Sequence, residues 1–244
     1  MTSLIRVKMT LRNVLYISYA VPEKNLRALV PDFMRLATLA KDVAFLSIVA
    51  LRSTKVRISS LPFAHFNYNQ LNLRTYIIDP VTGKHGVYFL KSGVTSRFIS
   101  LATRMIGIPW RHINLDVQVT PDINNVRSYN AGGKWQEDFH ITAVEVPEPL
   151  NKLTLFTDVE SAVDYLVRPL IGFFGESGHI GRFTIWHQDI MPQIWQLQQV
   201  NFPLLKELGI IEEVDKPHSV LFLPQADFYI YMPPTFIKKN GGEL

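Results

Sequence analysis

The chain has 244 residues, 47% of them hydrophobic and 11% aromatic, so it can bury a substantial core. Its 25 Lys and Arg residues exceed its 21 Asp and Glu residues by four, and they are scattered along the sequence, which predicts no nucleic-acid-binding stretch. The absence of cysteine excludes disulfides, thiolate metal ligands and thiol nucleophiles.

The N-terminal part of the chain is predicted to be mainly extended. Val14–Ala20 is rich in β-branched and aromatic residues, which is typical of a strand. Apolar residues at helical spacing in Glu23–Val30 predict a short helix that Pro31 ends. Val43–Leu51 is a short, nearly continuous apolar run, which favours a buried strand, and we interpret the polar segment Arg52–Pro62 as an irregular connection.

The segment Gln70–Asp116 has the pattern of strand, turn, strand, helix, tight corner and strand. Side chains alternate along a strand, so Asn72, Arg74 and Tyr76 share one face of its first strand. Burying an arginine within an apolar strand costs free energy of folding unless a partner accepts its hydrogen bonds or balances its charge. Its partner is therefore either a ligand carboxylate, held by two hydrogen bonds, or another group of the protein.

The helix of this segment is predicted to begin near Ser92 or Thr95 and to end at Gly107, with Pro109 as the stop beyond it. An apolar stripe recurs at helical spacing, and we expect it to pack inward: Phe98, Leu101, Ala102 and Met105.

The C-terminal half is predicted to contain a second hairpin around a Gly132-Gly133 turn, beginning at Asn124. Thr157–Glu160 resembles a capping box at the start of a helix. The run Gly172–Gly181 matches neither a phosphate-binding loop nor a dinucleotide fingerprint, so we interpret it as a flexible loop. The remaining predicted elements are strands at Leu153–Phe156, Arg182–Gln188, Ile190–Val200 and Ser219–Tyr231.

The central segment also carries a family resemblance. The runs NLRTY (from Asn72) and GVYFL (from Gly86), and a helix ending in GIP, resemble the YqjF-like family of the acetoacetate-decarboxylase-like superfamily. Weaker likeness extends from Pro22–Pro31 to Gly181–His187. The resemblance implies an α+β fold in one domain over residues 1–244: a single, mostly antiparallel, cone-shaped β-barrel with a few flanking helices and a ligand cavity inside.

Decarboxylases of that superfamily carry two adjacent lysines after the proline, and the first forms a Schiff base with the substrate. Trp110 and Arg111 occupy the matching positions, so the resemblance implies that this nucleophile is missing. Gln70 stands where the family often has an acidic residue, and glutamine cannot act as a general acid or base. Lys91 is either a displaced nucleophile or a strand-end lysine that reaches water.

From these features we expect a protein that binds, and in the stronger form of the hypothesis converts, a small organic acid or keto metabolite without a Schiff-base lysine. An enzyme of this kind would be lyase- or hydrolase-like. The ligand is expected to be a carboxylate, and the residues expected to hold or enclose it are Arg74, Arg111, Asn72, Tyr76, Tyr88, Trp110 and Gln70. The alternative is a non-catalytic sensor or structural protein whose barrel is filled by its own side chains.

Other partners are limited by composition. No apolar run approaches the ~20 residues of a membrane-spanning helix, so we expect a cytoplasmic protein without a membrane or nucleic-acid partner. The seven histidines show no metal-ligand spacing, and no metal or other cofactor is expected. A homo-oligomer is left open.

Overall fold

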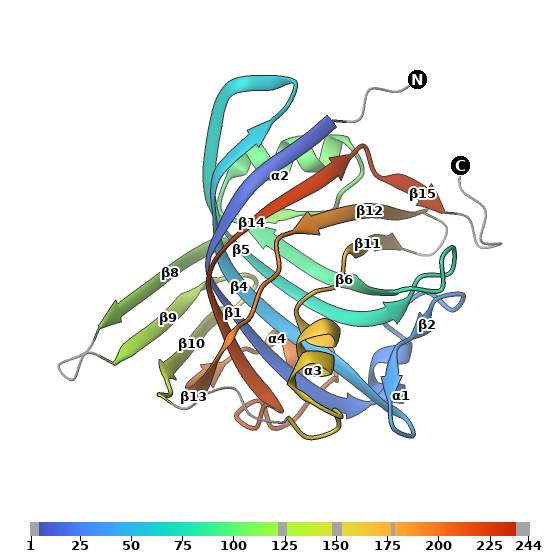
Figure 1. Ribbon diagram of the computed structural model, residues 1–244, viewed down its shortest axis with the longest axis vertical. Helices are drawn as coiled ribbons and strands as arrows, with labels where there is room; N and C mark the ends of the chain where they lie inside the picture. Colours follow the sequence, from blue (N-terminus) through green and yellow to red (C-terminus); the bar gives the residue numbers. More distant parts are fainter. Residues whose placement is uncertain (1–4, 122–125, 148–152, 177–178, 238–244) are drawn as a thin grey trace.

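The computed structural model describes residues 5–121, 126–147, 153–176 and 179–237. Within these ranges four helices accompany fifteen strands (Figure 1). The helices are α1 (Glu23–Arg27), α2 (Arg97–Met105), α3 (Val159–Leu166) and α4 (Leu204–Glu207). The strands are β1 (Ile5–Pro22), β2 (Arg35–Leu36), β3 (Thr38–Leu39), β4 (Val43–Ile58), β5 (Leu61–Ile78), β6 (His85–Val94), β7 (Arg111–His112), β8 (Asn114–Pro121), β9 (Arg127–Lys134), β10 (Asp138–Glu145), β11 (Ile171–Glu176), β12 (His179–His187), β13 (Gln193–Asn201), β14 (Ser219–Met232) and β15 (Thr235–Ile237).

The strands form one mostly antiparallel sheet in the order β15-β12-β11-β6-β5-β4-β1-β14-β13-β10-β9-β8. The pairs β6 with β11 and β6 with β7 are parallel. Strand β12 also pairs with β14, so β1, β4, β5, β6, β11, β12 and β14 are joined in a ring of pairings (Figure 1). Beyond β14 the sheet continues through β13, β10, β9 and β8, and β8 lies back against β1, β4 and β5.

Between Gln70 and Ile77, strand β5 is enclosed on both faces, which places this part of it between two cores. Leu73 and Ile77 on one face share a core with Ile141 of β10. Tyr76 on the opposite face shares a core with Val163 of α3. The alternation predicted for this strand is therefore confirmed, and its polar face is enclosed rather than solvated.

The segment Arg52–Pro62 is not an irregular connection, because β4 continues to Ile58 and β5 begins at Leu61. Lys55 has a positive φ of 52° and lies at a register shift between Ser53 and Val56. Such a β-bulge adds an unpaired residue and breaks the alternation of side chains. The bulge explains why a continuous strand resembled a loop in the sequence.

Glycines that predicted turns or flexibility instead allow close approach of neighbouring groups. Gly133 lies within β9, and a Cβ atom there would be 2.0 Å from the carbonyl oxygen of Asn114; the turn comes after it, at residues 135–137. The predicted start of this hairpin at Asn124 lies outside the described residues. The glycine-rich run forms the β11–β12 hairpin, in which a Cβ atom on Gly181 would be 2.1 Å from the ring of Phe174. Both interpretations from the sequence were wrong, because glycine content does not reveal which atoms lie opposite.

Helix α2 begins after Ser96, whose Oγ atom accepts a hydrogen bond from the Ile99 amide at 3.3 Å. The prediction that its apolar stripe packs inward was wrong: Ile99 and Ser100 are buried, whereas Phe98, Leu101 and Met105 are exposed. Helical spacing defines an apolar face but not what lies against it.

Two further predictions about the C-terminal half need correction. The short strand predicted at Leu153–Phe156 is a turn at the described residues. The capping box of α3 is formed by Asp158 and Ser161, not by Glu160, with the Asp158 carboxylate accepting from the Ser161 amide at 2.7 Å. The helix itself forms as predicted.

Candidate functional site

A cavity of about 230 Å³ lies where the corner after α2 meets β6 and the β11–β12 hairpin. Strand β6 carries a bulge here, because Leu90 lies between the pairs Leu73–Lys91 and Arg74–Phe89 without a partner of its own. Bulges bend a strand and redirect its side chains. Four consecutive residues of β6 therefore line the cavity, namely Phe89, Leu90, Lys91 and Ser92.

The corner that carries Trp110 and Arg111 is held by the backbone. Gly107 has a φ of +83°, as expected at a helix C′ position, and its amide donates to the Arg104 carbonyl at 3.1 Å. Ser100 of α2 donates from Oγ to the Trp110 carbonyl at 3.0 Å. The predicted helix end is confirmed, and it brings both residues to the cavity wall.

The cavity combines aromatic walls with charged groups. Phe89, Trp110, Trp135 and Phe174 are its aromatic residues, and Lys91, Arg111, Glu176 and His179 are its ionisable ones. Within the described parts of the chain, no ion pair joins Lys91 or Arg111 to a carboxylate. Two cations and one carboxylate thus remain available to a solute, which favours an anionic ligand.

Tyr88 supports the edge of the cavity without lining it. Its hydroxyl donates to the Gly175 carbonyl at 2.5 Å, and Gly175 does line the cavity. Burial, and to a lesser degree the negative charge of Glu176, raise the pKa of Tyr88 to about 12. Tyr88 therefore stays a neutral donor that holds the β11–β12 hairpin in place.

The polar face of β5 does not reach this cavity. Gln70, Asn72, Arg74 and Tyr76 are absent from its wall. Gln70 and Asn72 are buried and bond to each other, with Gln70 Nε2 donating to Asn72 Oδ1 at 3.0 Å. Of the seven ligand-binding residues predicted from the sequence, the structure brings Trp110 and Arg111 together and places Tyr88 beside them.

Arg74 lies against α3 instead. Its Nη2 atom donates to the Leu166 carbonyl at 2.7 Å, and its Cζ atom lies 5.3 Å from the Tyr16 ring centroid and 5.6 Å from that of Tyr76. Its Nε atom is buried, with no hydrogen-bond partner among the described residues. Leu166 is the last residue of α3, so this cation sits at the negative end of the helix dipole.

Sequence reasoning missed the contribution of the β11–β12 hairpin. Glu176 and His179 flank it at the cavity, although the run that contains them was interpreted as a flexible loop. The sequence does contain a signal for this hairpin, because aromatic and β-branched residues lie on both sides of the glycines, as in Phe173 and Phe183, and such residues are typical of strands.

Other hollows fit a ligand less well. Depressions of about 690 Å³ and 510 Å³ lie near α1 and α4, and both are more open to solvent. Neither has an aromatic residue in its wall. Across the described ranges, no group of three His, Asp or Glu side chains is placed to hold a metal ion.

The sequence matches a family model named DUF2071 and described as an uncharacterised conserved protein, over residues 8–227. A relative among curated proteins is the uncharacterised protein YqjF of Bacillus subtilis (strain 168). It is 24% identical over 224 residues, which cover 91% of this chain and 84% of YqjF.

Solved structures with the same fold are acetoacetate-decarboxylase-like. An acetoacetate decarboxylase-like enzyme from Sphingomonas wittichii RW1 matches with a TM-score of 0.60 and 11% identity, over 98% of this chain and 94% of that one. Acetoacetate decarboxylase from Legionella pneumophila matches with a TM-score of 0.59 and 14% identity, over 97% and 87%. The enduracididine biosynthesis enzyme MppR complexed with pyruvate matches with a TM-score of 0.50 and 9% identity, over 100% and 90%. At these identities the likeness establishes the fold alone.

Proposed function

This chain belongs to the DUF2071 family of uncharacterised conserved proteins, and we propose that it binds a small organic carboxylate in the cavity beside Arg111. The observation that carries the proposal is the placement of Arg111 next to Trp110 in the wall of one cavity. A guanidinium group binds a carboxylate through two parallel hydrogen bonds. The indole beside it suits the apolar body of the same ligand.

Charge in the cavity supports this assignment. Lys91 supplies a second cation from β6, and neither cation has an ion-pair partner in the described parts of the chain. A volume of about 230 Å³ favours a ligand smaller than a drug-sized molecule, whose pockets span ~300–1,000 Å³. A short-chain or keto carboxylate fits these limits.

The structural neighbours supply support by analogy only. MppR binds pyruvate, a keto acid, within the same fold. Proteins that share a fold often differ in function, so the residues of this chain's own cavity carry the proposal.

We propose in addition that the ring of seven strands closes into the cone-shaped barrel that the family resemblance implies, within one domain over residues 1–244. The ring of pairings from β12 through β1 and β14 back to β12 supports this arrangement. In such a barrel the inner face of β5 is packed with side chains, and the cavity lies towards β6 and β11.

In the stronger form of the proposal the ligand is also converted. Proton transfer would then fall to Glu176 or His179, which are the carboxylate and imidazole groups at the cavity. A lyase- or hydrolase-like reaction of this kind would not use a Schiff base at positions 110 and 111, because neither tryptophan nor arginine can form an imine there. Gln70, Asn72, Arg74 and Tyr76 have supporting roles in this version.

The experiment is a thermal-shift series with aliphatic and aromatic carboxylates and the corresponding primary amides. We expect the acids to raise the melting temperature and the amides to leave it unchanged. Losing a charge-assisted contact costs ~1.5–3 kcal/mol, so Arg111→Gln should weaken the affinity for acids about tenfold or more. Arg97→Gln is the matched control, since Arg97 is exposed on α2 and does not line the cavity.

The alternative, a protein whose interior is filled by its own side chains, predicts a different result. It is supported by the packed face of β5 that carries Tyr76, because Tyr76 and Phe45 of β4 share one core there and both are fully buried. If acids and amides shift the melting temperature equally, or if neither shifts it over a broad panel, the carboxylate proposal fails and this alternative replaces it.

A further inference from the structure

One end of the molecule exposes large apolar side chains on two neighbouring elements. Phe63, near the tip of the β4–β5 hairpin, is 97% exposed, and Met105 on α2 is 81% exposed. We call this set the apolar end, and its members are Leu61, Phe63, Phe98, Leu101, Met105 and Ile106. Stable soluble surfaces seldom gather so many large apolar groups without a partner.

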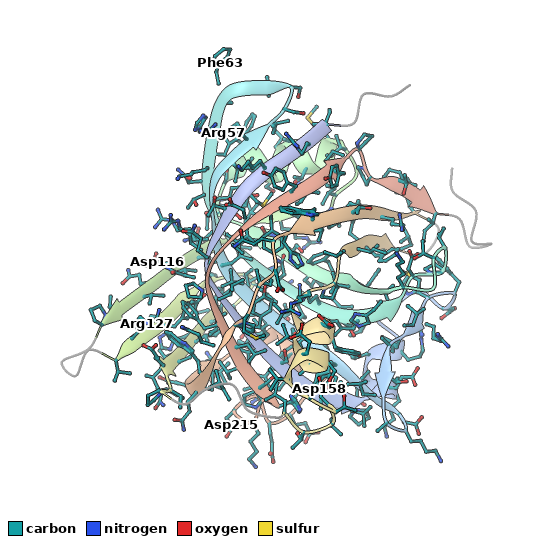
Figure 2. The ribbon with its side chains drawn as sticks, in the orientation of Figure 1. Arg57, Phe63, Asp116, Arg127, Asp158 and Asp215 are labelled. Atoms are coloured by element: carbon teal, nitrogen blue, oxygen red, sulfur yellow. The ribbon has the colours of Figure 1, made fainter. Side chains whose placement is uncertain are left out.

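The hairpin and the helix lie side by side. The ring of Phe98 on α2 stacks on that of Phe66 on β5, with centroids 5.3 Å apart and planes inclined by 15°. Figure 1 shows the β4–β5 hairpin projecting beyond the other strands at the top of the view, with α2 beside it. Figure 2 shows Phe63 at the outermost point of that hairpin and Arg57 on its flank.

The charge around the apolar end has one sign. Residues 5–8, 55–66 and 97–106 contain no Asp or Glu and six exposed cations: Arg6, Lys8, Lys55, Arg57, Arg97 and Arg104. The rest of the chain then holds 19 basic and 21 acidic residues, a net charge of −2, against +6 for these segments. The positive net charge of the protein is therefore concentrated at this end.

Two of these cations face each other across paired strands. Lys8 on β1 lies directly opposite Arg57 on β4 in the antiparallel register. Like charges in that position destabilise a sheet. An acid further along, Asp227 on β14, already accepts a hydrogen bond from Thr10 at 2.7 Å. An external polyanion would relieve the repulsion between Lys8 and Arg57.

We propose that this end of the protein docks onto an anionic lipid bilayer, with the apolar end in the headgroup region and the six cations against the lipid phosphates and carboxylates. The inference goes beyond the proposed carboxylate binding and does not depend on it. Nucleic acid would use the cations but would leave Leu101, Met105 and Ile106 without a role. A bilayer uses both, because apolar side chains enter the acyl boundary while basic residues bind the anionic surface.

The mode of attachment is peripheral. Among the described residues, no helix has the length and apolar character needed to cross a bilayer. Helix α2 is nine residues long and presents one apolar face, which suits a position in the plane of the interface.

The test is co-sedimentation with phosphatidylcholine vesicles, with and without about 30 mol% phosphatidylserine. We expect binding to the phosphatidylserine vesicles, weak binding to the neutral ones, and loss of binding at ~1 M NaCl, where the Debye length is ~3 Å. Each basic residue near an anionic surface strengthens binding about fivefold. The double variant Arg57→Glu with Arg97→Glu should therefore bind the vesicles about 25-fold more weakly, or more weakly still. Phe63→Ser with Met105→Ser should weaken it roughly tenfold or more.

Matched controls come from exposed positions remote from the apolar end. Lys84→Glu, in the turn between β5 and β6, and Met191→Ser, before β13, should bind as the unchanged protein does. Circular dichroism checks the fold of every variant, and light scattering gives the oligomeric state.

Three results would overturn the proposal. The first is no binding to phosphatidylserine vesicles by monomeric protein at low salt. The second is binding that the Phe63 and Met105 substitutions leave unchanged, which would indicate a purely electrostatic site such as one for nucleic acid. The third is a stable oligomer that those substitutions dissociate, which would show that a second copy covers the apolar end.

Discussion

Arg74 donates a hydrogen bond to the carbonyl oxygen of Leu166 at 2.7 Å, which joins the C-terminal part of β5 to the last residue of α3, 92 positions later in the chain. Tyr76 donates to the same oxygen at 2.8 Å. The two bonds satisfy a helix-terminal carbonyl that has no partner within the helix. An arginine that the sequence suggests as a ligand anchor thus has a protein partner.

Replacing Arg74 with alanine should lower the free energy of unfolding by about 1.5–3 kcal/mol, because a hydrogen bond from a charged donor is lost. Arg52→Ala is the matched control. Because Arg52 is exposed on β4, its replacement should lower the free energy of unfolding by less than ~0.5 kcal/mol. Urea unfolding at neutral pH measures both. Equal losses in the two variants would refute a structural role for Arg74, whereas retention of the carboxylate-induced thermal shift would agree with its position outside the cavity.

Gly133 and its neighbour Gly132 offer a matched pair in one strand. A Cβ atom on Gly133 would be 2.0 Å from the Asn114 carbonyl oxygen, so Gly133→Ala must push β8 away from β9. We expect a loss of about 3 kcal/mol in the free energy of unfolding. A Cβ atom on Gly132 would be 3.5 Å from the Phe139 carbonyl oxygen, an ordinary contact, so Gly132→Ala should be nearly neutral. Denaturant unfolding measures both variants. A larger loss in the free energy of unfolding for Gly132→Ala than for Gly133→Ala would contradict the observed pairing of β8 with β9.

His85 predicts a pH dependence of stability. Burial, and to a lesser degree the positive charge of Arg74, lower the pKa of His85 to about 4. Its ring stacks on Tyr76 with centroids 5.6 Å apart and also contacts Tyr165. Because the folded-state pKa is below the ordinary 6.5, the unfolded chain binds the proton first. The stabilisation is therefore fully present above pH 6.5 and is lost as the pH falls towards 4, by up to about 3 kcal/mol.

His85→Phe keeps an aromatic ring against Tyr76 and removes the titration. We expect the free energy of unfolding, measured with urea from pH 4.5 to 7.5, to rise less steeply with pH in this variant than in the unchanged protein. The free energy of unfolding of the variant should still depend on pH, because burial also lowers the pKa of His218. Identical slopes for the two proteins would rule out His85 as the source.

Borohydride reduction in the presence of acetoacetate should leave the mass of the protein unchanged, because neither Trp110 nor Arg111, the residues that follow the corner, can form an imine. Intact-protein mass spectrometry measures the outcome. Lys91→Ala is the informative comparison, since Lys91 lines the same cavity. An adduct that appears in the unchanged protein and disappears in this variant would show that Lys91 forms an imine, and would contradict the proposal of binding without a Schiff base.

Local rules were sufficient for several features of the structure. The positive φ of Gly107 and the stop at Pro109 fixed the corner that presents Trp110 and Arg111. Alternation along β5 placed Asn72 and Tyr76 on one enclosed face. These features depend on the backbone preferences of one residue or on the period of one element, and both can be read within a short window.

Only the tertiary structure decided the rest, because it depends on atoms far apart in the sequence. The role of Gly133 follows from the Asn114 carbonyl on another strand, and the partner of Arg74 is a helix end 92 residues later. The basic residues look scattered in the sequence, yet six of them lie on β1, β4 and α2, which meet at the end of the molecule that carries Phe63. Sequence spacing determines which side chains share an element, whereas the pairing of distant strands determines which elements share a surface.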